Sequence, residues 1–71
     1  MRKFVVCVDN EGYEASLEKR KLYEVVPDPD ALKHNQIRVI DESGEDYLFS
    51  TDCFLEVPLS EVIAEKLAHV A

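Results

Sequence analysis

The segment from Gln36 to Phe54 contains two short runs of β-prone residues that are separated by a turn. The runs are Ile37–Ile40 and Tyr47–Phe49, and the Asp-Glu-Ser-Gly between them suits a type I turn. A β-hairpin is therefore predicted here. Because apolar residues occupy adjacent positions in both runs, each face of the hairpin is apolar, and something besides one small core must cover it.

Two registers are open for this hairpin. One has a three-residue loop, Glu42–Gly44, with the glycine in the left-handed region, and it pairs Val39 with Tyr47. The other has a two-residue loop and pairs Val39 with Leu48.

Three further runs read as strands because they are rich in β-formers and bounded by turn residues. They are Phe4–Val8, Lys21–Val26 and Phe54–Val57. The first two are joined by a long irregular segment, in which Tyr13 and Leu17 are isolated apolar anchors.

The remaining connections also carry turn signals. Asp28 can cap a short helical turn that has Pro29 at its first position, and His34-Asn35 would end it. The polar run Ser50–Cys53 favours a tight or 3₁₀ turn before the last strand.

After Pro58 the apolar period changes from two to 3.6 residues. An amphipathic helix is predicted over residues 59–70, with Ser60 as its cap and Glu61, Glu65 and Lys66 on the polar side. Its apolar stripe consists of Leu59, Val62, Ile63, Leu67 and Val70.

The order of strands and turns resembles that of a Src-homology-3-like β-barrel, a mainly β fold of five short strands. The likeness spans Phe4 to Val57, and Asp46–Ser50 leading into Cys53-Phe54 resembles the end of that fold. We therefore expect one domain over residues 1–71, with the barrel at about 3–57 and the C-terminal helix at about 59–70.

Three phrases of the chain also resemble those of a group of short bacterial proteins with no established activity. They are Val6–Tyr13, Arg20–Val25 and Ile37–Leu48. The resemblance implies a bacterial, cytoplasmic protein and carries over no functional residue.

The composition bears on the partners that the protein can have. The net charge is −7, from eight basic and fifteen acidic residues, so most of the surface should repel a phosphate backbone. The alternative functions are a nucleic-acid-associated barrel that uses a local basic patch, or an acidic mimic that occupies the nucleic-acid site of a basic partner. The patch would consist of Arg2, Lys3, Lys19, Arg20 and Lys21.

No apolar run reaches the roughly 20 residues that a membrane span needs, and the apolar stretch Phe4–Val8 is too short for a secretory signal. A cytoplasmic location is the resulting expectation. Cys7 and Cys53 are then interpreted as reduced, buried thiols, and a disulfide between them is the alternative.

Neither catalysis nor metal binding is favoured. No serine lies in a nucleophile-elbow context, and Asp52 beside Cys53 opposes formation of its thiolate. A weak metal pattern, Asp28-x-Asp30-x-x-x-His34, is equally a proline turn with a capping aspartate. We expect no enzyme activity, no cofactor and no metal site.

The hypothesis that remains is a non-catalytic interaction or regulatory module. The C-terminal helix either folds back on its own barrel or docks on a second copy or another protein. The candidate partner contacts are Tyr13, Tyr23, Tyr47, Leu59, Val62, Ile63 and Leu67.

Overall fold

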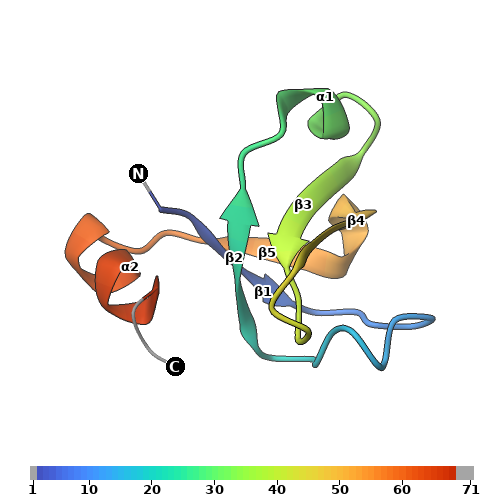
Figure 1. Ribbon diagram of the computed structural model, residues 1–71, viewed down its shortest axis with the longest axis horizontal. Coiled ribbons are helices and arrows are strands. Elements are labelled where there is room, and N and C mark those ends of the chain that lie inside the picture. The colour runs from blue at the N-terminus through green and yellow to red at the C-terminus, as the bar shows by residue number, and fades with distance from the viewer. Residues whose placement is uncertain (1, 69–71) are drawn as a thin grey trace.

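The computed structural model describes residues 2–68, which form a five-stranded antiparallel sheet with short helices (Figure 1). The elements are β1 (Phe4–Cys7), β2 (Leu22–Val26), α1 (Pro29–Leu32), β3 (Gln36–Ile40), β4 (Asp46–Ser50), the 3₁₀ turn η1 (Thr51–Cys53), β5 (Phe54–Val57) and α2 (Glu61–Ala68). Neither α-helix in this part of the chain is long and apolar enough to cross a membrane.

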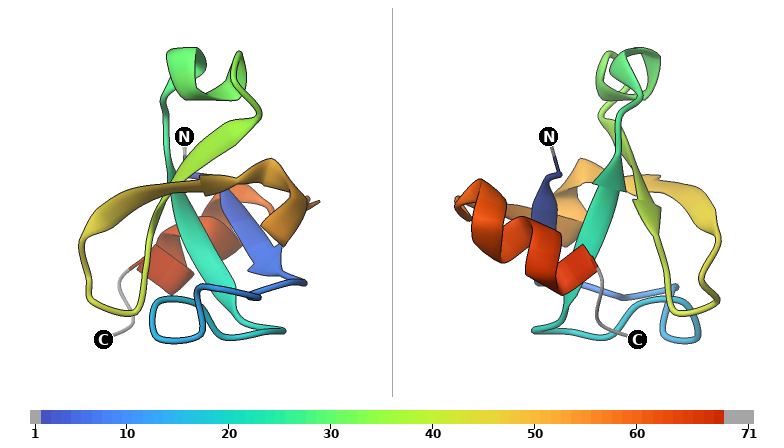
Figure 2. Two further views of the ribbon diagram at one scale, coloured as in Figure 1. Left: turned by 90° about the vertical axis from the view of Figure 1, so that its right-hand side faces the viewer. Right: turned by 60° about the vertical axis from the view of Figure 1, so that its left-hand side comes forward.

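The strands lie in the order β4-β3-β2-β1-β5, and β2 belongs to both halves of the sheet. Its first three residues pair with β1, whereas Val25 and Val26 pair with β3. The two halves therefore turn away from each other along β2, which Figure 2 shows from two sides. The sheet is not closed into a barrel, since no pairing joins the two edge strands β4 and β5 among the described residues.

The hairpin of β3 and β4 has the register of the three-residue loop. Val39 opposes Tyr47, Ile37 opposes Phe49, and Gly44 has a φ of +84°. The N–H of Asp41 donates to the carbonyl of Glu45 at 3.0 Å and closes the loop. The two-residue alternative is excluded because it would move β4 by one position and reverse its faces.

The core lies between the two halves of the sheet. Its buried members come from every strand, from the long β1–β2 loop and from η1, and they are Val5, Cys7, Leu17, Tyr23, Val39, Phe49, Cys53 and Phe54. Leu17, at 1% exposure, anchors the long loop as the sequence predicts. Leu48, on the outer face of the hairpin, is 38% exposed, so this face is covered only in part.

The predicted turns are confirmed by their hydrogen bonds. Asp28 accepts the N–H of Ala31 at 3.1 Å and caps α1, while Asn35 takes a left-handed φ of +58° just beyond its end. Ser50 accepts the N–H of Asp52 at 3.2 Å and begins η1.

The C-terminal helix begins at Glu61, two residues later than predicted, because Leu59 and Ser60 form its entry. Ser60 accepts the N–H of Ile63 at 3.3 Å, which confirms it as the cap. The expected end near Val70 lies outside the described residues. Figures 1 and 2 place α2 beside the start of β1, far from the β3–β4 hairpin, so the helix does not cover that hairpin.

Candidate functional site

The seven residues that the sequence indicates as partner contacts fall into three places. Tyr13 and Tyr47 are exposed at the hairpin side, with 39% and 48% of their surfaces accessible. Tyr23 is buried in the core at 4% exposure, so it is not available to a partner. The other four lie in or next to α2: Leu59, Val62, Ile63 and Leu67.

Tyr13 is both a loop anchor and a partly exposed ring. Its ring meets that of Phe49 edge-to-face, with centroids 5.1 Å apart. Its carbonyl accepts the N–H of Leu17 at 2.8 Å and closes a turn within the long loop. Tyr47, two residues before Phe49 in β4, donates its hydroxyl proton to Glu45 at 2.9 Å. The hydrogen bond to this carboxylate raises the pKa of Tyr47.

The apolar residues of α2 are not all buried against the body of the protein. Ala64 is 1% exposed, while Val62 and Ile63 are 67% and 50% exposed. The helix returns to the start of β1, where Glu65 lies 3.2 Å from the guanidinium of Arg2. Ala64 is therefore covered, and two large apolar residues of the helix are left at the surface.

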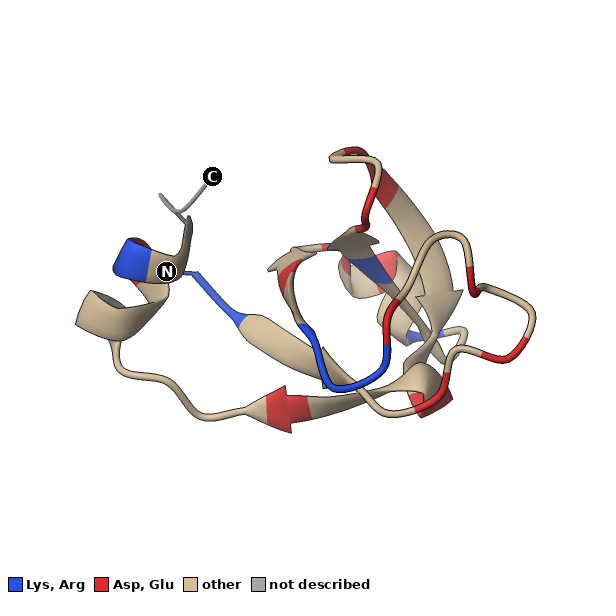
Figure 3. Cartoon of the chain, turned by 90° about the horizontal axis from the view of Figure 1, so that it is seen from below, with Lys and Arg blue, Asp and Glu red and all other residues tan. Residues whose placement is uncertain are grey.

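The basic patch suggested by the sequence is largely neutralised by carboxylates. Arg2 lies 2.7 Å from Glu24, and Lys3 lies 3.1 Å from Glu56. Lys21 is held at 2.7 Å by Glu42, and its pKa is raised by this hydrogen bond. Figure 3 shows two basic segments, at the start of β1 and before β2, among acidic ones.

The two cysteines lie in the core as free thiols, Cys7 at 0% and Cys53 at 6% exposure. Burial raises the pKa of both thiols. A buried thiol with a raised pKa is a poor nucleophile, because little thiolate forms near neutrality.

Asp28, one of the suggested metal ligands, has a structural role. The carboxylate of Asp28 caps α1 and also accepts from Arg38 at 3.0 Å. These two interactions, the cap first, lower the pKa of Asp28. Asp41, at 7% exposure, accepts from the backbone and hydroxyl of Ser43 at the hairpin turn. Within residues 2–68 no group of three or more His, Cys, Asp and Glu side chains is placed to hold a metal ion.

The structure also has a concave surface that the sequence did not indicate. It is a groove of about 470 Å³ between α1, the start of β1 and the linker that joins β5 to α2, and we call it the α1 groove. Its apolar walls are formed by Phe4, Val25, Leu32, Ile37, Val57 and Leu59. Pro27, Pro29 and Pro58 add further apolar surface.

Polar groups lie among the walls of the α1 groove. Arg38 reaches both Asp28 at 3.0 Å and Asp46 at 3.2 Å, and these bonds, that to Asp28 first, raise its pKa. The lining contains three cations and two carboxylates, although acidic residues outnumber basic ones by fifteen to eight in the chain. The groove is therefore a locally less acidic part of the surface.

Leu32 is a sequence signal that could have drawn attention to this groove. It lies in the short helical turn α1, and 56% of its surface is exposed. The residues three and four positions after this leucine are polar, so it is not part of an apolar helix face that could pack on the core. The other walls come from distant segments that only the fold brings together.

No protein-family model, no curated protein and no solved structure matches this chain.

Proposed function

We propose that the protein is a small, non-catalytic interaction module that binds an apolar segment of a partner protein in the α1 groove. The observation that carries this proposal is a groove of about 470 Å³ with apolar walls from five separate parts of the chain. This volume falls within the roughly 300–1,000 Å³ that is usual for ligand sites. An exposed leucine on its wall, Leu32, offers apolar surface that a partner would bury.

The charges of the groove favour a segment that carries carboxylates beside its apolar residues. Three cations line it, and within residues 2–68 the ion-pair partner of Lys3 is a well-exposed glutamate, Glu56. An exposed ion pair of this kind is worth little, so exchange of Glu56 for a carboxylate of the partner costs little. A basic segment would instead be attracted to the more acidic remainder of the surface.

As to fold, we propose that the sheet is an open relative of the Src-homology-3-like barrel. The order β4-β3-β2-β1-β5, the sharing of β2 and the 3₁₀ turn between β4 and β5 support this relation. The unpaired edges depart from a closed barrel. Proline-rich ligands, which such domains hold between aromatic rings, are not favoured, because Tyr23 is buried.

The proposal is tested with a display library of random twelve-residue peptides. Peptides selected on the wild type are measured by fluorescence anisotropy against Leu32→Lys and Ile63→Lys. Ile63 is the matched control, since the two residues are 56% and 50% exposed and Ile63 lies outside the groove. We expect apolar peptides with acidic flanks, about tenfold weaker on Leu32→Lys, a loss of about 1.4 kcal/mol, and unchanged on Ile63→Lys.

Two outcomes would contradict the proposal. One is a selected pool that binds Leu32→Lys as tightly as the wild type. The other is a selection that enriches no specific sequence on the wild type.

A further inference from the structure

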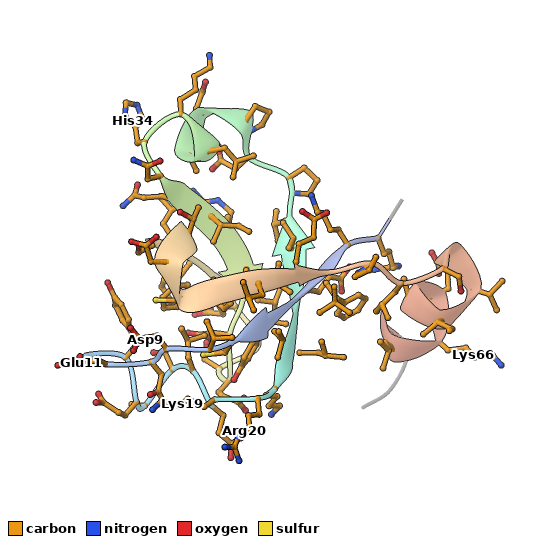
Figure 4. All side chains as sticks on the ribbon, turned by 180° about the vertical axis from the view of Figure 1, so that it is seen from behind. Asp9, Glu11, Lys19, Arg20, His34 and Lys66 are labelled. Atoms are coloured by element: carbon orange, nitrogen blue, oxygen red, sulfur yellow. The ribbon has the colours of Figure 1, made fainter. Side chains whose placement is uncertain are left out.

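Two neighbouring cations stand out because carboxylates do not neutralise them. Of the eight lysines and arginines, five form ion pairs within residues 2–68: Arg2, Lys3, Lys21, Lys33 and Arg38. Lys19, Arg20 and Lys66 have no such partner there. Figure 4 shows Lys19 and Arg20 together on the loop that leads into β2, while Lys66 lies apart on α2.

Arg20 has a backbone conformation that favours glycine, with a φ of +69°. Its N–H donates to the carbonyl of Cys7 at 2.8 Å, and the N–H of Cys7 donates to the carbonyl of Lys21 at 3.0 Å. Arg20 and Lys21, which lead into β2, thus both face Cys7 of β1. This arrangement is a β-bulge whose first residue is left-handed. Glycine would fit here without strain, so the fold itself does not require arginine.

An apolar surface begins beside these cations. Val6 of β1 opposes Leu22 of β2 and Leu55 of β5, so the three side chains form a row on one face of the sheet. Leu55 is 60% exposed, and Val8, two residues after Val6, is 45% exposed. A concavity of about 430 Å³ is lined by Val6, Cys7, Val8, Lys19 and Arg20.

We propose that this face, the bulge surface (Val6, Val8, Lys19, Arg20, Leu22 and Leu55), docks an acidic amphipathic segment of a partner protein. The carboxylates of the segment pair with Lys19 and Arg20, and its apolar side chains cover Val8 and Leu55. Charge complementarity favours this occupant, because the two cations have no ion-pair partner in the described part of an acidic protein and adjoin exposed apolar side chains. A nucleic acid fits less well, since two cations neutralise few phosphates and aliphatic side chains recognise none.

The bulge surface shares no residue with the α1 groove, so the two proposals are tested independently. The probes are two fluorescent peptides that contain glutamate and leucine. One alternates the two residues, and the other places leucine at helical spacing. Their controls are the same peptides with glutamine in place of glutamate, and a single-stranded oligonucleotide. Affinity is measured by anisotropy, and the site is mapped by amide chemical shifts.

We expect a glutamate peptide to shift the amides of Val6, Val8 and Arg20 and to bind at least about tenfold more tightly than its glutamine control. Lys19→Glu should abolish binding. Lys33→Glu, which makes the same charge change at a lysine paired with Asp30, should not. Equal binding of the glutamine peptide, tighter binding of the oligonucleotide, or shifts confined elsewhere would overturn the proposal.

Arg20→Gly separates a binding role of the arginine from a structural one. The substitution removes the left-handed strain, so the urea midpoint should rise, while peptide binding should fall about tenfold. The expected result is therefore a higher urea midpoint together with weaker peptide binding. A lower midpoint for Arg20→Gly, or undiminished peptide binding by this folded variant, would show that the arginine does not serve a ligand.

Discussion

The hydroxyl oxygen of Tyr23 lies 2.5 Å from a carboxylate oxygen of Glu42, and it also accepts the N–H of Glu18 at 2.7 Å. Lys21 approaches the same carboxylate within 2.7 Å. One buried phenol thus connects β2, the long β1–β2 loop and the tip of the β3–β4 hairpin. Burial, and secondly the bond to Glu42, raise the pKa of Tyr23, so the phenol keeps its proton and remains a donor.

Tyr23→Phe should therefore destabilise the protein by about 1–3 kcal/mol, because Glu18 loses the acceptor of its N–H and Glu42 loses a donor. The free energy of unfolding is measured by urea denaturation. Tyr47→Phe is the matched control, since its hydroxyl also bonds a glutamate but the residue is 48% exposed. Its cost should stay below about 0.5 kcal/mol. Equal losses in the two variants would show that the Tyr23 hydroxyl does not hold these elements together.

The same carboxylate gives a prediction for pH. The hydrogen bonds from Lys21 and then Tyr23 lower the pKa of Glu42 below its ordinary value. The unfolded chain then binds more protons than the folded one between the two pKa values, so stability from Glu42 is complete above the unfolded pKa. It is lost as the pH falls through the folded pKa.

We therefore expect the stability difference between wild type and Glu42→Gln to be greatest near neutral pH. It should shrink steadily below about pH 4, the ordinary range of a glutamate pKa. Urea midpoints of both proteins are measured from pH 7 downward. Acidification also relieves repulsion among the other carboxylates, but this effect is common to both proteins and cancels in the difference. A difference that grows on acidification would mean that Glu42 is not stabilised as a carboxylate.

How much the sequence predicted depended on whether a feature is local. The hairpin, the Asp28 cap and the Ser50 turn were predictable because their chemistry lies within a few residues. The sequence did not indicate which residues of the basic patch are neutralised, since the carboxylate that pairs with Arg2 lies at Glu24 and only the register of β1 and β2 brings it near. The α1 groove has walls from five segments, so no local pattern could announce it.

The C-terminal helix shows where periodicity stops being informative. The spacing predicted a helix here and placed Val62 and Ile63 in its apolar stripe. In the structure Ala64 is covered, whereas Val62 and Ile63 are exposed. Which side of an amphipathic helix is buried depends on its entry geometry, and sequence spacing does not specify that.

Gly44 offers a test of the hairpin register. Its φ of +84° suits glycine, and no atom lies within 4 Å of where a Cβ would stand. The cost of Gly44→Ala is therefore conformational, and we expect about 1 kcal/mol of destabilisation. Gly44→Asn should cost less, because asparagine tolerates the left-handed region. If urea denaturation gave the two variants equal stability to wild type, the three-residue loop would be wrong.

The helix α2 is held at the start of β1 by an ion pair and by the burial of Ala64. Phe4 and Ala64 are buried, at 6% and 1% exposure, but neither belongs to the main core cluster. Because α2 returns to the start of β1, where Arg2 meets Glu65, we infer that this helix shields that end of the sheet. The exposed ion pair itself is worth little, so the apolar contact at Ala64 should dominate.

Ala64→Asp should therefore lower the free energy of unfolding by more than about 2 kcal/mol, since it buries a carboxylate without a partner. Val62→Asp makes the same change in the same helix at a residue that is 67% exposed, and it should cost less than about 0.5 kcal/mol. Urea denaturation and sedimentation velocity of both variants test this. If Val62→Asp were as costly, and the wild type sedimented as a dimer that this variant lost, α2 would owe its stability to a second copy. The helix would then dock on another chain and not on its own sheet.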